Sequence, residues 1–175
     1  MRDPAADLQR DEFWMRHALQ QAQLAQTRQE VPVGAVAVVG DTCISSAYNQ
    51  TISSCDPSAH AEIVVLRDAA RTLRNHRLPQ VTLYVTLEPC MMCAGALIQA
   101  RIARLVYGAK EPKAGAVDTH PLLRSEWLNH QLPVSGGVLA DACGQIMSHF
   151  FADRRVPAAE PGRRRLLNDR EYRKE

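Results

Sequence analysis

The sequence contains no long hydrophobic run. Within its 175 residues no stretch of about 18 or more apolar residues occurs, which excludes a transmembrane helix. The first residues, MRDPAADLQRDEFW, are polar and acidic and do not resemble a signal peptide. Internal repeats are absent as well. We therefore expect a cytoplasmic protein that does not associate with membranes.

A disulfide framework is also missing. The chain has five cysteines, an odd number, and Cys90 and Cys93 form a C-x-x-C pair. This pattern is typical of reduced thiols and a metal site. The other three are expected to be small buried side chains: Cys43, Cys55 and Cys143. Cys55 is the one that could reach the metal site as a fourth ligand.

Charge is unevenly distributed along the chain. The net charge is +2, but the residues from Arg154 onward carry eight Lys or Arg against four acidic residues. We expect one domain over residues 1–156, because 46% hydrophobic residues suffice for a core, and a basic tail over 157–175. Such a tail suggests a polyanionic partner. A solvated tail with no partner is the alternative reading.

Hydrophobic spacing predicts strands that alternate with helices. One helix start is marked by Asp56 as N-cap and Pro57 at the first helical position. The predicted helices cover 12–26, 56–75, 90–100 and 139–155, the predicted strands cover 33–39, 43–48, 81–86, 103–107 and 134–138, and 115–129 is expected to be a loop with a short helix. This alternation predicts an α/β fold whose sheet is covered on both faces.

Two short segments carry metal-ligand residues: His60-Ala61-Glu62 and Pro89-Cys90-Met91-Met92-Cys93. One imidazole and two thiolates supply three zinc ligands. Three protein ligands leave the fourth tetrahedral position open, as in catalytic zinc sites. A structural zinc knot would need four ligands, and only three have an obvious place here.

Glu62 is expected to act beside the metal rather than on it. Residues two apart on a helix point about 200° apart, so His60 and Glu62 can serve one site only near the helix start. A zinc-activated water has a pKa of about 7, and a nearby carboxylate can shuttle its protons. The combination H-x-E…P-C-x-x-C is the signature of zinc-dependent nucleobase deaminases.

The segments 56–63 (DPSAHAEI) and 86–98 (TLEPCMMCAGALI) resemble the bacterial tRNA-specific adenosine deaminases. The resemblance extends through 31–36 (VPVGAV), 107–109 (YGA) and 148–151 (SHFF), and so covers nearly all of residues 12–155. It implies a cytidine-deaminase-like fold, a three-layer α/β/α sandwich with a mixed five-stranded sheet.

The resemblance also implies an activity and its residues. The activity is hydrolytic deamination of adenosine to inosine at the wobble position (34) of a tRNA anticodon, with tRNA-Arg as the expected partner, one Zn²⁺ per subunit and a homodimer. His60, Cys90 and Cys93 would hold zinc, Glu62 would be the general acid and base, and substrate contacts would come from Asn49, Pro32, Val33, the Ala61 N–H, Leu87 and Phe150. Glu111 stands where the family usually has an aspartate beside the target ribose.

Two alternatives remain from the sequence. A guanine or other free-base or nucleoside deaminase would use the same zinc chemistry, although guanine deaminases tend to have a Ser-Cys-Glu-Pro-Cys-Pro-Met-Cys run where this chain has TLEPCMMC at 86–93. A non-catalytic RNA-binding zinc module would make Glu62 incidental.

Overall fold

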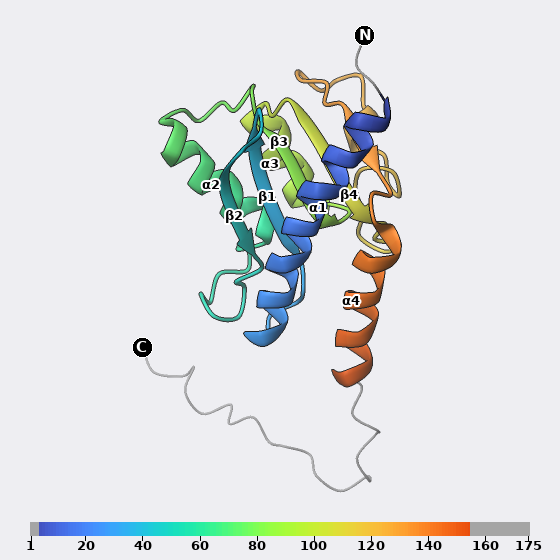
Figure 1. Cartoon of the computed structure of the whole chain (residues 1–175). Helices are drawn as coiled ribbons and strands as arrows, with labels where there is room; N and C mark the ends of the chain where they lie inside the picture. Colours follow the sequence, from blue (N-terminus) through green and yellow to red (C-terminus); the bar gives the residue numbers. More distant parts are fainter. Residues whose placement is uncertain (1–3, 155–175) are drawn as a thin grey trace, which may run out of the picture.

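A computed structural model of the chain describes residues 4–154. The predicted tail over 157–175 lies outside the described residues. The elements are α1 (Pro4–Thr27), β1 (Gly34–Val39), β2 (Thr42–Tyr48), α2 (Ala61–Leu73), β3 (Thr82–Leu87), α3 (Met91–Ala100), β4 (Arg104–Ala109), the 3₁₀ helix η1 (Leu122–Arg124), β5 (Val134–Gly136) and α4 (Ala140–Arg154) (Figure 1). No helix within the described residues is long and apolar enough to cross a membrane.

The five strands form one mixed sheet in the order β2-β1-β3-β4-β5. β1 pairs antiparallel with β2, because Gly40 and Asp41 turn the chain back directly after β1. β1 also pairs antiparallel with β3 on its other side. β4 pairs parallel with β3, and β5 pairs parallel with β4. The predicted α/β fold with a mixed five-stranded sheet is therefore confirmed.

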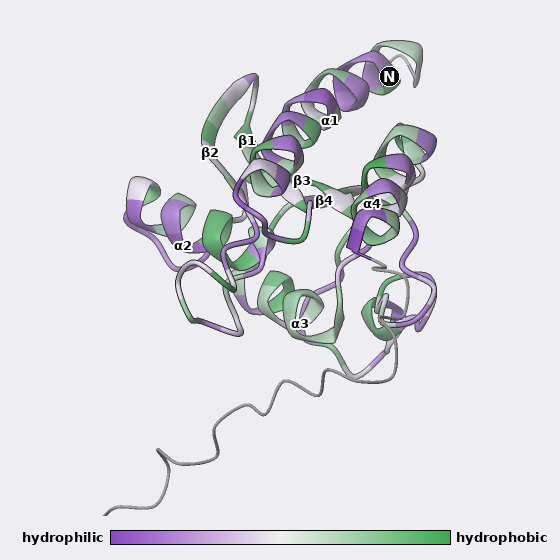
Figure 2. Ribbon diagram, turned by 90° about the horizontal axis from the view of Figure 1, so that it is seen from below, coloured by the Kyte–Doolittle hydropathy of each residue, from purple (hydrophilic) through white to green (hydrophobic). Residues whose placement is uncertain are grey.

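Helices cover both faces of the sheet, so the molecule has three layers. Figure 2 shows α1 and α4 on one side of the strands and α2 and α3 on the other. One core cluster joins the α2 and α3 layer to the sheet through residues such as Val65, Leu97 and Val85. The second cluster joins α1 and α4 to the opposite face, with Trp14 and Cys143 among its members.

Helix α1 lies unusually close to strand β1. A Cβ atom on Gly34 would come within 2.1 Å of the Ala18 carbonyl oxygen and within 2.5 Å of the Ala22 nitrogen. Only glycine fits at this position, since the backbones themselves are in contact. The apolar face predicted for this helix is confirmed, with Met15, Ala18 and Ala22 fully buried, although the helix begins eight residues before the predicted start.

The predicted start of α2 at Asp56 is wrong. The helix begins at Ala61, and His60 is its N-cap. The Asp56 carboxylate accepts hydrogen bonds from the Ser58 N–H at 2.8 Å and the Ser58 hydroxyl at 2.7 Å. This local bonding stabilises a turn that competes with the helix. As a result His60 precedes the helix instead of lying within its first turn.

The expected burial of the three remaining cysteines is confirmed only for Cys143. Cys43 and Cys55 are exposed. Cys43 lies on the edge strand β2, and Cys55 lies in a turn with a positive φ of 50°. Residue type alone did not reveal that these two side chains face solvent.

A buried carboxylate ties α1 to the sheet at the end of the molecule where α1 begins. Asp11, only 4% exposed, accepts two hydrogen bonds from the Arg104 guanidinium, at 2.8 and 2.6 Å. It also accepts one from the Tyr84 hydroxyl at 3.0 Å. Because Tyr84 lies on β3 and Arg104 on β4, this one side chain joins three elements.

We expect Asp11→Asn to lower the free energy of unfolding by about 1–3 kcal/mol, because the half-buried Arg104 charge loses its counterion. Urea denaturation followed by circular dichroism measures the change. The control is Asp41→Asn, which removes the exposed Arg10–Asp41 ion pair and should change stability by less than about 1 kcal/mol. Equal effects of the two substitutions would contradict the structural role of Asp11.

Candidate metal centre

Two helix N-termini meet at the predicted metal site. His60 is the N-cap of α2 and Cys90 is the N-cap of α3, and both have extended backbone conformations. Neither side chain caps its own helix, so both are free to bind a metal. Cys93 follows in the first turn of α3 and is fully buried. The backbone N–H groups of a first turn favour thiolates at this position.

The three side chains fit a tetrahedral zinc ion. The Nδ1 atom of His60 lies 3.7 Å from the Cys90 sulfur and 3.5 Å from the Cys93 sulfur. Zinc–sulfur and zinc–nitrogen bonds of about 2.3 and 2.0–2.1 Å at tetrahedral angles would separate these atoms by about 3.6 Å. The donor atoms are therefore spaced as a zinc ion requires, and their chemistry is that of zinc ligands.

The site favours a cation electrostatically. Hydrogen bonds from Cys93 and His60 lower the pKa of Cys90, so this sulfur carries negative charge at neutral pH. The hydrogen bond to Cys90, together with burial, raises the pKa of Cys93. The hydrogen bond to Cys90 likewise raises the pKa of His60. A bound cation would replace the protons that these three groups share.

Among the described residues, this is the one group of three or more His, Cys, Asp or Glu side chains close enough to hold a metal, with all ligand atoms within 4.8 Å of one another. Cys55 is not part of it. The site therefore offers three protein ligands and leaves one tetrahedral position, which is the arrangement of catalytic zinc.

Glu62 lies in the first turn of α2 beside this group. Its side chain is only 3% exposed. Burial raises the pKa of the Glu62 carboxyl, and a hydrogen bond links it to Cys93. A buried carboxyl group beside a metal site is suited to accept and return protons. It is not one of the three metal-ligating side chains.

The metal group opens into a cavity of about 260 Å³. Its wall combines apolar side chains with a few polar groups, as is typical of small-molecule sites. The lining residues are Val31, Val33, Asn49, Thr51, His60, Glu62, Leu87, Glu88, Cys90, Glu111, Ala114, Met147 and Phe151. Of the substrate contacts predicted from the sequence, the structure thus brings Val33, Asn49, Leu87 and Glu111 to this cavity.

Three predicted contacts do not line the cavity. Pro32 is buried beside it. The Ala61 N–H donates to Asn49 Oδ1 at 2.8 Å, so it is already bonded within the protein. Phe150 is 5% exposed and packs inward, whereas its neighbour Phe151 is 46% exposed and lines the cavity.

Sequence reasoning missed several lining residues, among them Thr51, Ala114 and Met147. No motif marks these positions. For Phe151 a signal did exist, since two adjacent aromatic residues on a helix cannot both face one core. Glu88 lies inside the TLEPC segment, where no sequence signal distinguishes its role, and its burial is known only from the structure.

A larger cavity of about 650 Å³ adjoins the first and shares Leu87, Glu111, Met147 and Phe151 with it. Its remaining wall contains three cationic side chains, Lys110, Lys113 and Arg154. The metal centre therefore opens toward a positively charged surface.

Comparison with known proteins agrees with this geometry. Residues 9–155 match the MafB19-like deaminase family. The chain is 48% identical over 148 residues to the tRNA-specific adenosine deaminase of Haemophilus influenzae, covering 83% of this chain and 85% of that one. It is 43% identical over 146 residues to the tRNA-specific adenosine deaminase of Bacillus subtilis, covering 83% and 91%.

The fold is also similar to solved structures of deaminases. A structure from a study of A-to-I editing by tRNA:A34 deaminases at the wobble position superposes with a TM-score of 0.75 at 43% identity, over 77% of this chain and 98% of that one. A guanine deaminase from Nitrosomonas europaea shares the fold, with a TM-score of 0.68 at 23% identity over 81% and 84% of the two chains. The chain belongs to the family of tRNA-specific adenosine deaminases.

Proposed function

We propose that the protein converts adenosine to inosine at the wobble position (34) of a tRNA anticodon. The observation that carries this proposal is the three-ligand zinc-type group with buried Glu62 beside it, in a cavity that opens onto a basic surface. The relatives that share this architecture at more than 40% identity are named for tRNA-specific adenosine deamination.

His60, Cys90 and Cys93 would hold one Zn²⁺ per subunit. When bound, the ion supplies Lewis acidity that makes a water molecule nucleophilic at neutral pH. Glu62 would accept a proton from the water that attacks C6 of adenine and would deliver this proton to N1. Glu62 would then pass the second proton of that water to the amino group, so that it can leave. The products would be ammonia and inosine.

The cavity wall would orient the base and its ribose. Val33 and Leu87 supply apolar contacts to the ring. Asn49 is held by its Oδ1 bond to the Ala61 N–H, which leaves its amide NH₂ for the substrate. One carboxylate oxygen of Glu111 accepts the Lys113 N–H at 2.9 Å, and the other is available for a ribose hydroxyl.

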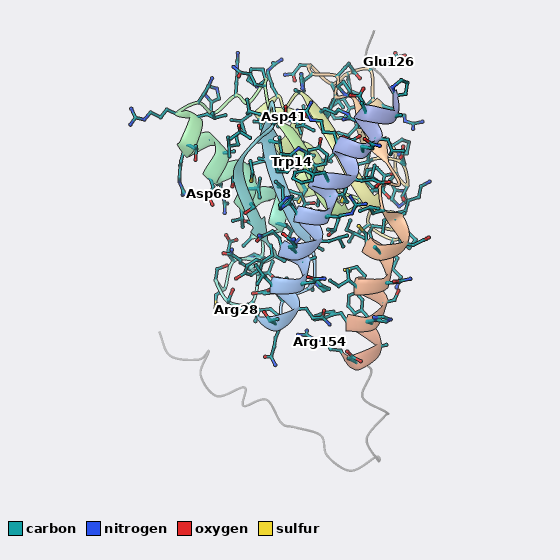
Figure 3. All side chains as sticks on the ribbon, in the orientation of Figure 1. Trp14, Arg28, Asp41, Asp68, Glu126 and Arg154 are labelled. Carbon is teal, nitrogen blue, oxygen red and sulfur yellow. The ribbon has the colours of Figure 1, made fainter. Side chains whose placement is uncertain are left out.

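An RNA loop fits the surroundings of the cavity. Unstacked loop bases can enter such a pocket, whereas bases within a duplex cannot. Phe151, which lines the cavity, would stack against a neighbouring base. Lys110, Lys113 and Arg154, which line the larger cavity, would contact phosphates. Figure 3 shows Arg28 and Arg154 at the same end of the molecule, where α1 and α4 end, which extends the basic surface.

A free-base deaminase is the second candidate. The guanine deaminase structure supports the shared fold alone at 23% identity. The cationic cavity beside the metal centre favours RNA, because a free base has no phosphates to contact.

We also propose a specific tRNA substrate and a cellular compartment. We expect tRNA-Arg with adenosine at position 34 as substrate. We also expect the protein to act in the cytoplasm, where its five cysteines would remain reduced, and all five are free in the structure.

We further propose a homodimer. An apolar groove of about 520 Å³ lies between α2 and α3, with Ile63, Leu66 and Ala96 in its wall. Met91 and Met92, which start α3, are 68% and 40% exposed and extend this apolar surface. A second copy of the chain would cover the face, next to both metal-bearing helix ends.

The purified protein should contain about one zinc per chain by plasma emission spectrometry. Cys93→Ala should lose the metal and the activity, because two remaining ligands hold zinc weakly. The control is Cys143→Ala, since Cys143 is buried in the other core cluster, away from the metal centre. Equal zinc content in the Cys93→Ala variant and the wild type would refute the ligand assignment.

Glu62→Gln should lower turnover by about 10²–10⁴ or more while zinc remains bound, because the proton shuttle is lost. Inosine formation is measured on an anticodon stem-loop of tRNA-Arg, with free adenosine and guanine as comparison substrates. Product from the loop alone is expected. Product from guanine would favour the free-base enzyme, and loop binding without product would favour a non-catalytic module.

Light scattering should give twice the chain mass of 19.4 kDa for the wild type. Ala96→Arg should shift the protein to the monomer mass, because it places a charge in the α2–α3 groove. Gln20→Arg, on an exposed position of α1, is the control and should remain dimeric. A monomeric wild type would contradict the proposed dimer.

A further inference from the structure

Four acidic side chains are buried within the described part of the chain: Asp11, Glu30, Glu62 and Glu88. Glu62 lies at the metal centre, and Asp11 pairs with Arg104 at the far end of the sheet. Glu30 and Glu88 have no ion-pair partner among residues 4–154. Burying a charge is costly unless hydrogen bonds satisfy it, so both side chains need an explanation.

Glu88 is satisfied by the loop that follows β4. Its Oε1 accepts the N–H groups of Val117, Asp118 and Thr119 at 3.2, 2.8 and 2.8 Å. Its Oε2 accepts the Glu111 N–H at 3.1 Å and the Thr119 hydroxyl at 2.7 Å. Burial opposes ionisation, but these bonds, led by those from Thr119, lower the pKa of Glu88 to about 2.

This loop also reaches the metal-bearing segment. Gly115 forms a β-bridge with Cys90, and the Ala116 N–H donates to the Pro89 carbonyl at 2.8 Å. A Cβ atom on Gly115 would lie 2.4 Å from the Glu88 carboxyl carbon, so the loop can pass over the carboxylate only with glycine here. The residues that this loop contributes to the cavity are Glu111 and Ala114.

Glu30 holds the loop after β2 in the same manner. It is fully buried and accepts the N–H groups of Ile52 and Ser53, the latter at 2.7 Å. It also accepts the Thr51 hydroxyl at 3.3 Å. This loop continues from Asn49, and both Asn49 and Thr51 line the cavity.

We propose that Glu30 and Glu88 are positioning residues that hold the two cavity-lining loops in the shape that binds the target nucleoside. The inference rests on the proposed function. Neither carboxylate has to touch substrate, because each acts through the loop that it holds. When the cavity loops already have the binding shape, no free energy is lost in ordering them as the substrate binds. Glu30 and Glu88 should therefore affect substrate binding more than the chemical step.

The number of acceptors explains why carboxylates are used. An ionised carboxylate accepts about four hydrogen bonds and donates none. A glutamine at position 88 would turn an NH₂ group toward backbone N–H donors, and the loop would have to shift. An apolar residue would leave the same N–H groups buried without partners. The loop geometry therefore depends on the charge as well as on the volume of the side chain.

The test compares Glu30→Gln and Glu88→Gln with Asp11→Asn in the full chain. Asp11 is equally buried but contacts neither cavity loop, so it reports plain destabilisation. Kinetics on an anticodon stem-loop are measured at a temperature where all variants are folded. We expect KM to rise about tenfold in both glutamine variants, kcat to change by less than about threefold, and zinc content to remain that of the wild type.

Thr119→Val provides a milder variant if Glu88→Gln does not fold. It removes one donor to Glu88 and should raise KM in the same direction by a smaller factor. An unchanged KM in the glutamine variants, or an equal rise in Asp11→Asn, would overturn the proposal. Failure of the proposed function is distinguishable, because the wild type itself would then produce no inosine from the stem-loop.

Discussion

The site depends on the meeting of two helix N-termini at one end of the sheet. His60 and Cys90 occupy the N-cap positions of α2 and α3, and their side chains are not used for capping. The first turns behind them contribute Glu62 and Cys93. One arrangement thus brings together the three candidate metal ligands and the carboxyl group that we propose as the proton carrier, in surroundings where backbone N–H groups favour negatively charged sulfur.

The sheet makes this meeting possible. β3 lies beside β1, and the α2 and α3 layer packs on the face that both strands share. The chain enters α3 directly after β3, while it reaches α2 through the loop that follows β2. Residues 30 positions apart, His60 and Cys90, therefore come within 3.7 Å of each other. On the opposite face, α1 and α4 close the core, and α4 contributes Met147 and Phe151 to the cavity.

The other buried carboxylates differ in which parts of the structure they hold together. Asp11 ties α1 to β3 and β4 through a guanidinium and a hydroxyl group. Glu30 and Glu88 instead bind loop backbone, at the end of the molecule that carries the metal centre. Asp11 thus stabilises the packing of a helix on two strands. The shapes of the loops that face a substrate depend instead on the carboxylates of Glu30 and Glu88.

The sequence alone determined the metal ligands, Glu62 and most strands, because each is encoded by short-range spacing: C-x-x-C within one turn, H-x-E at a helix start, and runs of β-branched residues. Tertiary structure decided the rest. The choice of Phe151 over Phe150 depended on how α4 is rotated against the sheet, and the Ala61 N–H was taken by Asn49, twelve residues away. These outcomes arise from contacts between distant segments, which local sequence patterns do not encode.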